Sequence, residues 1–533
     1  MSDLNNNIAA SRIKQAERAD RRPKTGLAVA HGLCFVRARP WLVTGLSVAL
    51  VVPCFWHRQV EAGDFGSHAY NAWLAHLIRH GQAPGLYTVW PWTNVLVDVL
   101  LERLGAVVGF ANATKLTAAM CVLIFFWGAF ALIAAATRQT PWSLVPAIAM
   151  ITYGWSFQMG FMNYCVSLGL AFFAVALFWR GSLADWVLGL LLTALALLAH
   201  AVGFAWLIGT AVYILLRERS HGWTRVVLFA GALLAIIVVH IYVSHHLRTE
   251  SPIFRRFLHL SGVDQLVVYG YTGVDQLVLY GYRYNKLAKS ALLFAVLCYI
   301  IGTIRGLKKP ELWRTLGTPI ELWGMALFAT AMLWEQIFFP QHAESFGAIG
   351  ERLSSITAVL GLCILGCVRP SKVHFVGWLC IMIVFFSWMY QDTGVLNDME
   401  EQAEMLVHQL PYGTRIVQTI FGPPGSRVAI AHMVDRACIG LCFTYSNYEA
   451  PERKFRIRAT PGNPIVTDSV DAKDAMERGR YVVQPQDLPM AEIYQCDSGD
   501  LTRLCLRELT AGEVNGRLGY LPPRLRRRAE QNP

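Results

Sequence analysis

The sequence predicts an all-α polytopic membrane protein with a small α+β domain at its C-terminal end. Of its 533 residues, 54% are hydrophobic and only 16% are charged. The mean hydropathy of +0.38 lies outside the range typical of soluble globular chains. Seventeen Trp and nineteen Tyr fit a chain with many membrane–water interfaces, where these amphipathic rings settle.

The apolar runs predict about eleven transmembrane helices, because a helix needs roughly 20 apolar residues to cross a bilayer. The predicted spans are 41–57, 115–136, 142–160, 162–179, 184–199, 201–216, 223–243, 289–305, 318–338, 353–369 and 373–391. The stretch 184–216 fits either two short helices or one long broken helix. The fourth span begins almost where the third ends, so the count is eleven within one or two.

Charge gives an orientation. Residues 1–40 are polar and basic and resemble a cytoplasmic tail, since no small-residue cleavage site follows the first apolar run. With the N-terminus inside, every second connection should be basic. Those connections carry Arg138, Arg180, Arg217, Arg219, Arg225, Arg305, Lys308, Lys309, Arg314, Arg369 and Lys372. External loop 1 (58–114), the loop 244–288 and everything after 391 are therefore expected outside.

Residues 392–533 differ in character and predict an extracytoplasmic α+β domain. An amphipathic helix pattern at 396–410 precedes short β-like runs, "RIVQTIF", "RVAIAHM", "KFRIRA" and "RYVVQ", separated by Pro/Gly turns. The domain contains Cys438, Cys442, Cys496 and Cys505. In an oxidising compartment these fit two disulfides, with Cys496–Cys505 the first pairing to consider, or else four free thiols.

One internal repeat is present. "GVDQLVVYGYT" (262–272) is followed directly by "GVDQLVLYGYR" (273–283). A period of eleven is close to three helical turns, so a duplication of this length keeps the phase of a helix. We expect a tandem duplication in a helix on the membrane surface, with Asp264 and Asp275 solvated.

External loop 1 opens with "GDFGSHAYN" (63–71). On a helical wheel, residues 64–80 place Phe65, Ala69, Ala72, Trp73, His76 and Leu77 on one apolar stripe. Asp64, His68, Asn71 and Arg79 fall on the opposite side, and the i, i+4 spacing brings Asp64 and His68 within reach of each other. This predicts an interfacial helix that presents a carboxylate with an imidazole behind it. The alternative is charge stabilisation of a helix N-terminus beside an incidental histidine.

A second helix is predicted at 93–104 in the same loop. It lines up Asn94, Asp98 and Glu102 at i, i+4 and i+8. Asp98 and Glu102 are either acids that take part in a functional site or, together with Asn94, a solvated polar face of the helix.

The layout of most of the chain, and the segment "GDFGSHAYNAWLAHLIRHGQAPGLY" (63–87), resemble the GT-C superfamily of membrane glycosyltransferases, which use polyprenyl-phosphate sugars as donors. The segments 160–179 and 351–362 are also similar to bacterial members. The resemblance implies a GT-C-like transmembrane domain at 41–391. It gives Asp64 the role of general base for the acceptor hydroxyl, with His68 as its companion.

The chain departs from the family pattern at two points. Many members have a second acid beside the first, where this chain has Phe65. The Glu-Lys-Pro-Pro type of motif is absent, and "WPWTN" stands in that region. No cofactor is therefore assigned, no metal ligand is named, and the sequence does not support a divalent metal.

Sugar transfer from a lipid phosphate needs a base for the incoming hydroxyl and positive charge for the leaving phosphate. The external candidates for the phosphate are Arg248, Arg255, Arg256, Arg283 and Lys286; solvation is the alternative for each. Asp98, Glu102 and Glu351 are candidates for the acceptor or for a second acid, although Glu351 and Arg352 could equally form a local ion pair.

The predicted function is inverting transfer of a sugar from a polyprenyl-phosphate donor to a cell-envelope glycan, lipid or protein. The reaction is expected at the outer face of a bacterial inner membrane. Two alternatives stay open: a transporter or lipid flippase, for which His200 is the residue to watch, and a non-catalytic cell-envelope assembly protein. Scarce charges within the spans disfavour a coupled carrier. Nucleic acid is not an expected partner, because the basic residues follow the predicted topology.

Overall fold

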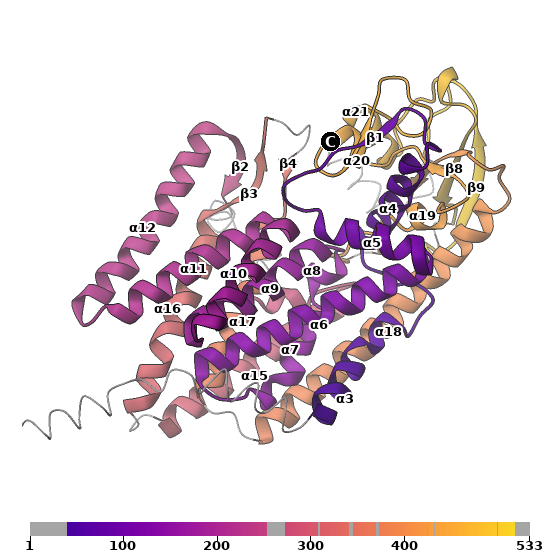
Figure 1. Cartoon of the computed structure of the whole chain (residues 1–533). Helices are drawn as coiled ribbons and strands as arrows, with labels where there is room; N and C mark the ends of the chain where they lie inside the picture. Colours follow the sequence, from indigo (N-terminus) through magenta and orange to yellow (C-terminus); the bar gives the residue numbers. More distant parts are fainter. Residues whose placement is uncertain are drawn as a thin grey trace, which may run out of the picture.

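The computed structural model describes residues 40–252, 272–306, 310–340, 345–368, 372–423, 425–430, 432–497 and 499–516. It is a bundle of long helices with a small mixed domain packed against one end (Figure 1). Within the described chain, seven helices are long and apolar enough to cross a membrane. They are α6 (Phe110–Thr137), α9 (Met162–Arg180), α11 (Ala201–Arg219), α12 (Trp223–His246), α15 (Arg283–Gly306), α17 (Ile349–Cys367) and α18 (Lys372–Val407). The fold is therefore consistent with a multi-pass membrane protein.

The helices differ in how much of their surface the protein covers. α6 and α9 are central and approach closely at Gly128, where an added Cβ would lie 2.2 Å from the carbonyl oxygen of Gly169. In α12 no residue is buried, and Val238, Val239 and Ile241 are exposed. An uncovered apolar helix of this kind suits contact with lipid.

Three predicted spans differ from the structure. The first is only α3 (Pro40–Val51) and the 3₁₀ turn η1 (Val52–Cys54). The span predicted at 142–160 is wrong: it divides into η2 (Trp142–Leu144), α7 (Val145–Thr152) and α8 (Trp155–Gln158). The chain is extended at Gly154, which packs against Gln276. The span predicted at 318–338 ends early, because α16 (Pro310–Met332) gives way to strand β3 (Trp334–Phe338).

The stretch 184–216 is two helices, α10 (Leu183–Ala199) and α11. His200 stands between them with an extended backbone, and its Nδ1 accepts a hydrogen bond from the backbone N–H of Val202 at 3.2 Å. The histidine therefore caps α11.

Small sheets lie at the same end of the bundle. β2 (Arg248–Pro252), β3 and β4 (Ser345–Phe346) form an antiparallel sheet in that order. β1 (Leu86–Thr88), in loop 1, pairs antiparallel with β7 (Ile457–Ala459). A four-stranded sheet has the order β6 (Phe443–Thr444), β5 (Arg415–Thr419), β8 (Met490–Gln495) and β9 (Leu504–Leu509). β5 is parallel to β6 and β8, while β8 and β9 are antiparallel.

The chain beyond α18, which we call the C-terminal domain, combines this sheet with α19 (Met433–Ala437), α20 (Glu449–Glu452), α21 (Val470–Glu477) and the turn η4 (Pro485–Asp487). Two β-like runs form strands, as β5 and β7. The described residues of the run 427–433 form no strand, and 480–484 form only an isolated bridge from Val482 to Val514. Both disulfides are present, Cys438–Cys442 and the expected Cys496–Cys505.

The helix predicted at 396–410 is not separate. Its residues continue the last apolar helix without a break, so α18 is a single helix of 36 residues. At 1.5 Å per residue it is roughly 54 Å long. It connects the bundle to the C-terminal domain without a helix break.

The second copy of the repeat is not a surface helix. Its residues Val274–Leu277 form the 3₁₀ turn η3, and Leu277, Leu279 and Tyr280 are buried. Asp275, predicted to be solvated, is buried and accepts a hydrogen bond from the Ser354 hydroxyl at 2.7 Å. The turn starts at Gly273, where φ is +93° and a Cβ would lie 2.4 Å from the Ala358 Cα. Residues 262–271 of the first copy, with Asp264, lie outside the described residues.

Candidate functional site

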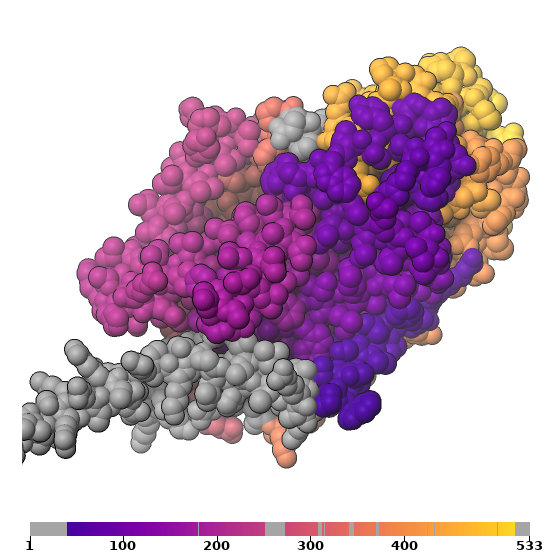
Figure 2. Space-filling view, in the orientation of Figure 1, coloured from indigo at the N-terminus to yellow at the C-terminus, as the bar shows by residue number. Residues whose placement is uncertain are grey.

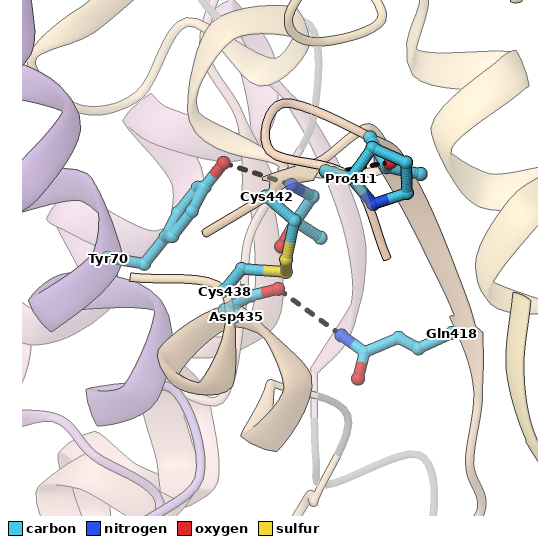
Figure 3. Close-up of a disulfide and its surroundings, with 8 residues drawn as sticks. Tyr70, Pro411, Gln418, Asp435, Cys438 and Cys442 are labelled. Carbon is cyan, nitrogen blue, oxygen red and sulfur yellow. Dashed lines mark hydrogen bonds between the residues drawn. A yellow bond between two sulfur atoms is a disulfide. The ribbon is translucent and has the colours of Figure 1, made fainter. Parts of the chain in front are cut away.

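The first helix of loop 1 forms as predicted, as α4 (Phe65–Arg79), but it does not lie on a surface. Almost every residue of α4 is buried, including His68 and Asn71 on its polar side. The C-terminal domain covers that side, where the His68 ring meets the edge of Phe455 with 5.7 Å between centroids. It also binds another face of α4: the Tyr70 hydroxyl accepts a hydrogen bond from the backbone N–H of Thr444 at 2.9 Å, beside the Cys438–Cys442 disulfide (Figure 3). Figure 2 shows loop 1 and the C-terminal domain packed together, with a recess between them and α12.

The glycines of "GDFGSHAYN" have a steric reason. An added Cβ would lie 2.6 Å from the Met159 carbonyl oxygen at Gly63, where φ is +31°, and 2.6 Å from the His432 carbonyl oxygen at Gly66. The backbone N–H of Asp64 donates to the Met159 carbonyl at 3.0 Å. Asp64 is thus held between the turn before α9 on one side and the C-terminal domain on the other.

The Asp64 carboxylate is partly open, with 29% of its side chain exposed. It does not cap α4, and no described residue donates a hydrogen bond to it. Among the described residues the nearest cation is His432, whose Nε2 lies 3.8 Å from Asp64 Oδ1. His432 is oriented by Asp435, with 3.1 Å between Nδ1 and Oδ2, and its ring packs against Tyr448.

His432 is a cation at neutral pH. Burial alone would lower its pKa, but the hydrogen bond to Asp435 and the charges of Asp435 and Asp64 outweigh burial and raise the pKa to about 9. Asp435 is itself held by Gln418, whose Nε2 donates to it at 3.3 Å (Figure 3). The C-terminal domain therefore places a fixed positive charge beside Asp64.

His68 is oriented in a similar way, by a carboxylate that a residue of the helical bundle binds in turn. Its Nδ1 lies 2.6 Å from Asp98 Oδ1, and Asp98 Oδ2 accepts a hydrogen bond from Asn163 Nδ2 at 2.9 Å. Burial lowers the pKa of His68, but the charge and hydrogen bond of Asp98 raise it to about 9. Asp98, on α5 (Leu96–Val108), is thus the partner of His68.

Glu102 is also buried and fully engaged. It accepts hydrogen bonds from Arg79 of α4 and, at 2.7 Å, from Arg456 of the C-terminal domain. Asp98 and Glu102 are therefore not a solvated polar face. The observed contacts of Glu102 join three segments of the fold.

Arg352, at the start of α17, is a second cation that interacts with Asp64, without forming an ion pair with it. Its guanidinium carbon lies 4.2 Å from the Phe161 ring centroid and 4.6 Å from that of Phe346, and it interacts electrostatically with Asp64. Its Nε and Nη1 are buried and have no hydrogen-bond partner among the described residues. No ion pair with Glu351 forms there. The Glu351 carboxylate oxygen Oε2 is likewise buried without a described partner.

The residues predicted to bind phosphate are dispersed. Arg248, in β2, lies over the Phe338 ring at 4.7 Å. Arg283 binds Asp392 of α18 at 2.6 Å, and Lys286 is exposed on α15. Arg255 and Arg256 lie outside the described residues. The described contacts of Arg248 and Arg283 therefore do not bring them to Asp64.

Sequence reasoning missed His432, which falls where a β-like run was expected, and Asp435, which follows that run. Their i, i+3 spacing in "HMVD" was the available signal. The described residues contain no group of three or more His, Cys, Asp or Glu that could hold a metal ion. Comparisons with protein-family models, curated proteins and solved structures find no match to this chain.

Proposed function

We propose that the chain is an inverting membrane glycosyltransferase of the GT-C type, with Asp64 as its general base. The observation that supports this most is that two oppositely charged side chains, Asp64 and Arg352, have polar atoms without described hydrogen-bond partners. Asp64 is partly exposed and accepts no hydrogen bond from any described residue, and Arg352, which interacts with it electrostatically, has two buried donors without a partner in the described chain. Buried donors are normally satisfied, so the unpaired Nε and Nη1 of Arg352, whose charge interacts with Asp64, suit an anionic ligand.

The proposed reaction uses both charges. Asp64 takes the proton from the acceptor hydroxyl as that oxygen bonds to the anomeric carbon. The bond from the anomeric carbon to the phosphate oxygen breaks on the opposite face, and polyprenyl phosphate leaves with the electron pair. Arg352 stabilises the charge that develops on the phosphate, because a guanidinium matches phosphate oxygens through paired N–H donors.

The proposed setting follows from the predicted orientation. The α4 end of the bundle is placed at the outer face of a bacterial inner membrane, within a GT-C-like architecture of about eleven spans. The donor is a polyprenyl-phosphate-linked sugar, and the acceptor is a cell-envelope glycan, lipid or protein. His200, the residue to watch for a transporter, caps α11 and packs against Tyr164 and Phe346 at the end of the bundle. These contacts give it a structural role and add no support to the transporter alternative.

The experiment separates the two roles in full-length protein reconstituted in membranes. A panel of polyprenyl-phosphate sugars serves as donor, with released polyprenyl phosphate as the readout of transfer. Asp64→Asn should abolish transfer but retain donor binding, whereas Arg352→Gln should weaken donor binding. Asp471→Asn, on exposed α21, is the matched control and should match the wild type. Transfer by Asp64→Asn at the wild-type rate would remove Asp64 from the mechanism.

A further inference from the structure

A cavity of about 450 Å³ lies between α18 and the loop that follows η1. One wall is the face of α18 with Tyr390, Gly394, Asp398 and Glu401, and the other is formed by residues 57–59. Its lining includes no residue of the Asp64 site. It is therefore a separate hollow on the same end of the bundle.

The cavity begins where α18 stops being apolar. Residues 372–389 are almost free of charge, and Tyr390 is the first residue that lines the hollow. The Tyr390 ring stacks on His57 with 4.6 Å between centroids and meets the edge of Trp56 at 5.3 Å. Aromatic rings of this kind concentrate at membrane–water interfaces. If α18 spans the bilayer, the hollow lies at headgroup level.

An apolar track leads to the same point. Val48 and Val52, on α3 and η1, and the adjoining Phe55 are 59%, 51% and 46% exposed, and they precede His57 directly in the chain. Figure 1 shows α3 alongside α18, and Trp56 contacts Phe386 of that helix, with 6.5 Å between ring centroids. A lipid chain could lie along this track with its headgroup at the cavity.

The unsatisfied groups of the cavity are hydrogen-bond acceptors. The carboxylates of Asp398 and Glu401 are exposed and form no ion pair with any described residue. Gln59 donates through its Nε2 to Glu404 at 3.4 Å, but its Oε1 is buried and no described residue donates to it. Glu404 is already paired with Arg58 at 2.6 Å. The cavity thus has excess negative charge, and its unpaired acceptors suit a ligand that has N–H donors.

We propose that this cavity binds the primary ammonium of an aminophospholipid such as phosphatidylethanolamine. An ammonium group has three N–H donors and one positive charge, which match the carboxylates of Asp398 and Glu401 and the orphan oxygen of Gln59. Arg58, with 62% of its side chain exposed, stands on the same loop to meet the lipid phosphate. This site needs α18 to lie in a membrane but does not depend on the proposed transferase activity.

The test uses delipidated full-length protein and counts retained lipids by native mass spectrometry. Phosphatidylethanolamine should be retained, and phosphatidylcholine, whose quaternary ammonium has no N–H, should not. The double substitution Asp398→Asn/Glu401→Gln should weaken retention about tenfold or more, the scale of one lost charge-assisted hydrogen bond. Val395→Trp, which fills the cavity without changing its charge, should have the same effect.

The matched control is Asp471→Asn/Glu508→Gln, which removes the same charge from exposed positions of the C-terminal domain and should retain lipid normally. Equal retention of the two lipids, or normal retention by both cavity variants, would overturn the proposal. So would displacement of the lipid by soluble ethanolamine at a similar concentration, because the ligand would then be a free amine.

Discussion

Two groups of charges at the α4 end of the molecule are built in opposite ways. In the first, which we call the Arg436 cluster (Glu61, Glu400 and Arg436), the guanidinium makes hydrogen bonds to both oxygens of Glu400 and to the Val60 carbonyl, and an ion pair with Glu61 at 3.3 Å. Glu61 Oε1 is the one side-chain atom of this cluster that is buried without a described hydrogen-bond partner. In the second, which we call the Asp64 cluster (Asp64, Arg352 and His432), His432 lies 3.8 Å from Asp64 and Arg352 interacts with Asp64 electrostatically, but among the described residues only His432 has a side-chain hydrogen-bond partner.

The difference distinguishes a charge cluster that stabilises the fold from one that is available to a ligand. A buried charge without a hydrogen-bond partner is costly, so folding alone favours the arrangement of the Arg436 cluster. That cluster joins α18 and α19 to the loop before α4. The Asp64 cluster leaves donors and a carboxylate unused at a point where four segments meet, and this is where a ligand would complete the set.

The largest effect on stability is expected at the Arg436 cluster. Arg436→Leu leaves Glu400 and Glu61 buried without a cation, so the free energy of unfolding should fall by about 3–5 kcal/mol. Thermal unfolding of the purified protein measures this. An unchanged midpoint would show that the cluster does not support the fold.

The next effect depends on pH. His432 and His68 have folded pKa values of about 9, above the ordinary 6.5, so each stabilises the fold fully below pH 6.5 and loses this contribution as pH rises through 9. The shift corresponds to at most about 3 kcal/mol for each residue. Unfolding midpoints between pH 6 and 10 should decline in the wild type and decline less in His432→Asn. Parallel profiles for the two proteins would contradict the raised pKa of His432.

A smaller effect is expected from the close contact between α4 and the C-terminal domain. Gly66→Ala adds a Cβ that would lie 2.6 Å from the His432 carbonyl oxygen, so it should cost about 1–3 kcal/mol of unfolding free energy. Gly209→Ala in α11, where nothing lies within 4 Å, is the control and should be neutral or stabilising. Equal midpoints for the two variants would mean that the contact is loose.

Local patterns predicted much of the fold. The wheel of residues 64–80 identified α4 and placed His68 opposite the apolar stripe, and apolar runs located most of the long helices. The sequence could not show that α4 is covered, because the residues that cover it are remote: Thr444 is 374 positions from Tyr70, and Arg456 is 354 from Glu102. The break at Gly154 was missed for the same reason: Gln276, which lies against Gly154 and accepts a hydrogen bond from the backbone N–H of Ser156, is 120 positions from Ser156.

The same limit applies to the site. Asp64 and His68 were found because their spacing is local, and Asp98 because its helix follows closely. Arg352 was noted only beside Glu351, and His432 was missed, since each approaches Asp64 through tertiary packing alone. The cationic residues of the loop 244–288 were chosen by predicted side of the membrane, a criterion that carries no distance to Asp64.

The central claim is that Asp64 serves a reaction and does not support the fold. The most direct measurement determines sugar transfer and the unfolding midpoint on one preparation of Asp64→Asn. We predict that transfer falls by at least about 100-fold, the scale of general base catalysis. The free energy of unfolding derived from the midpoint should stay within about 0.5 kcal/mol of the wild-type value. Transfer at the wild-type rate, or a loss of stability like that of Arg436→Leu, would contradict the account.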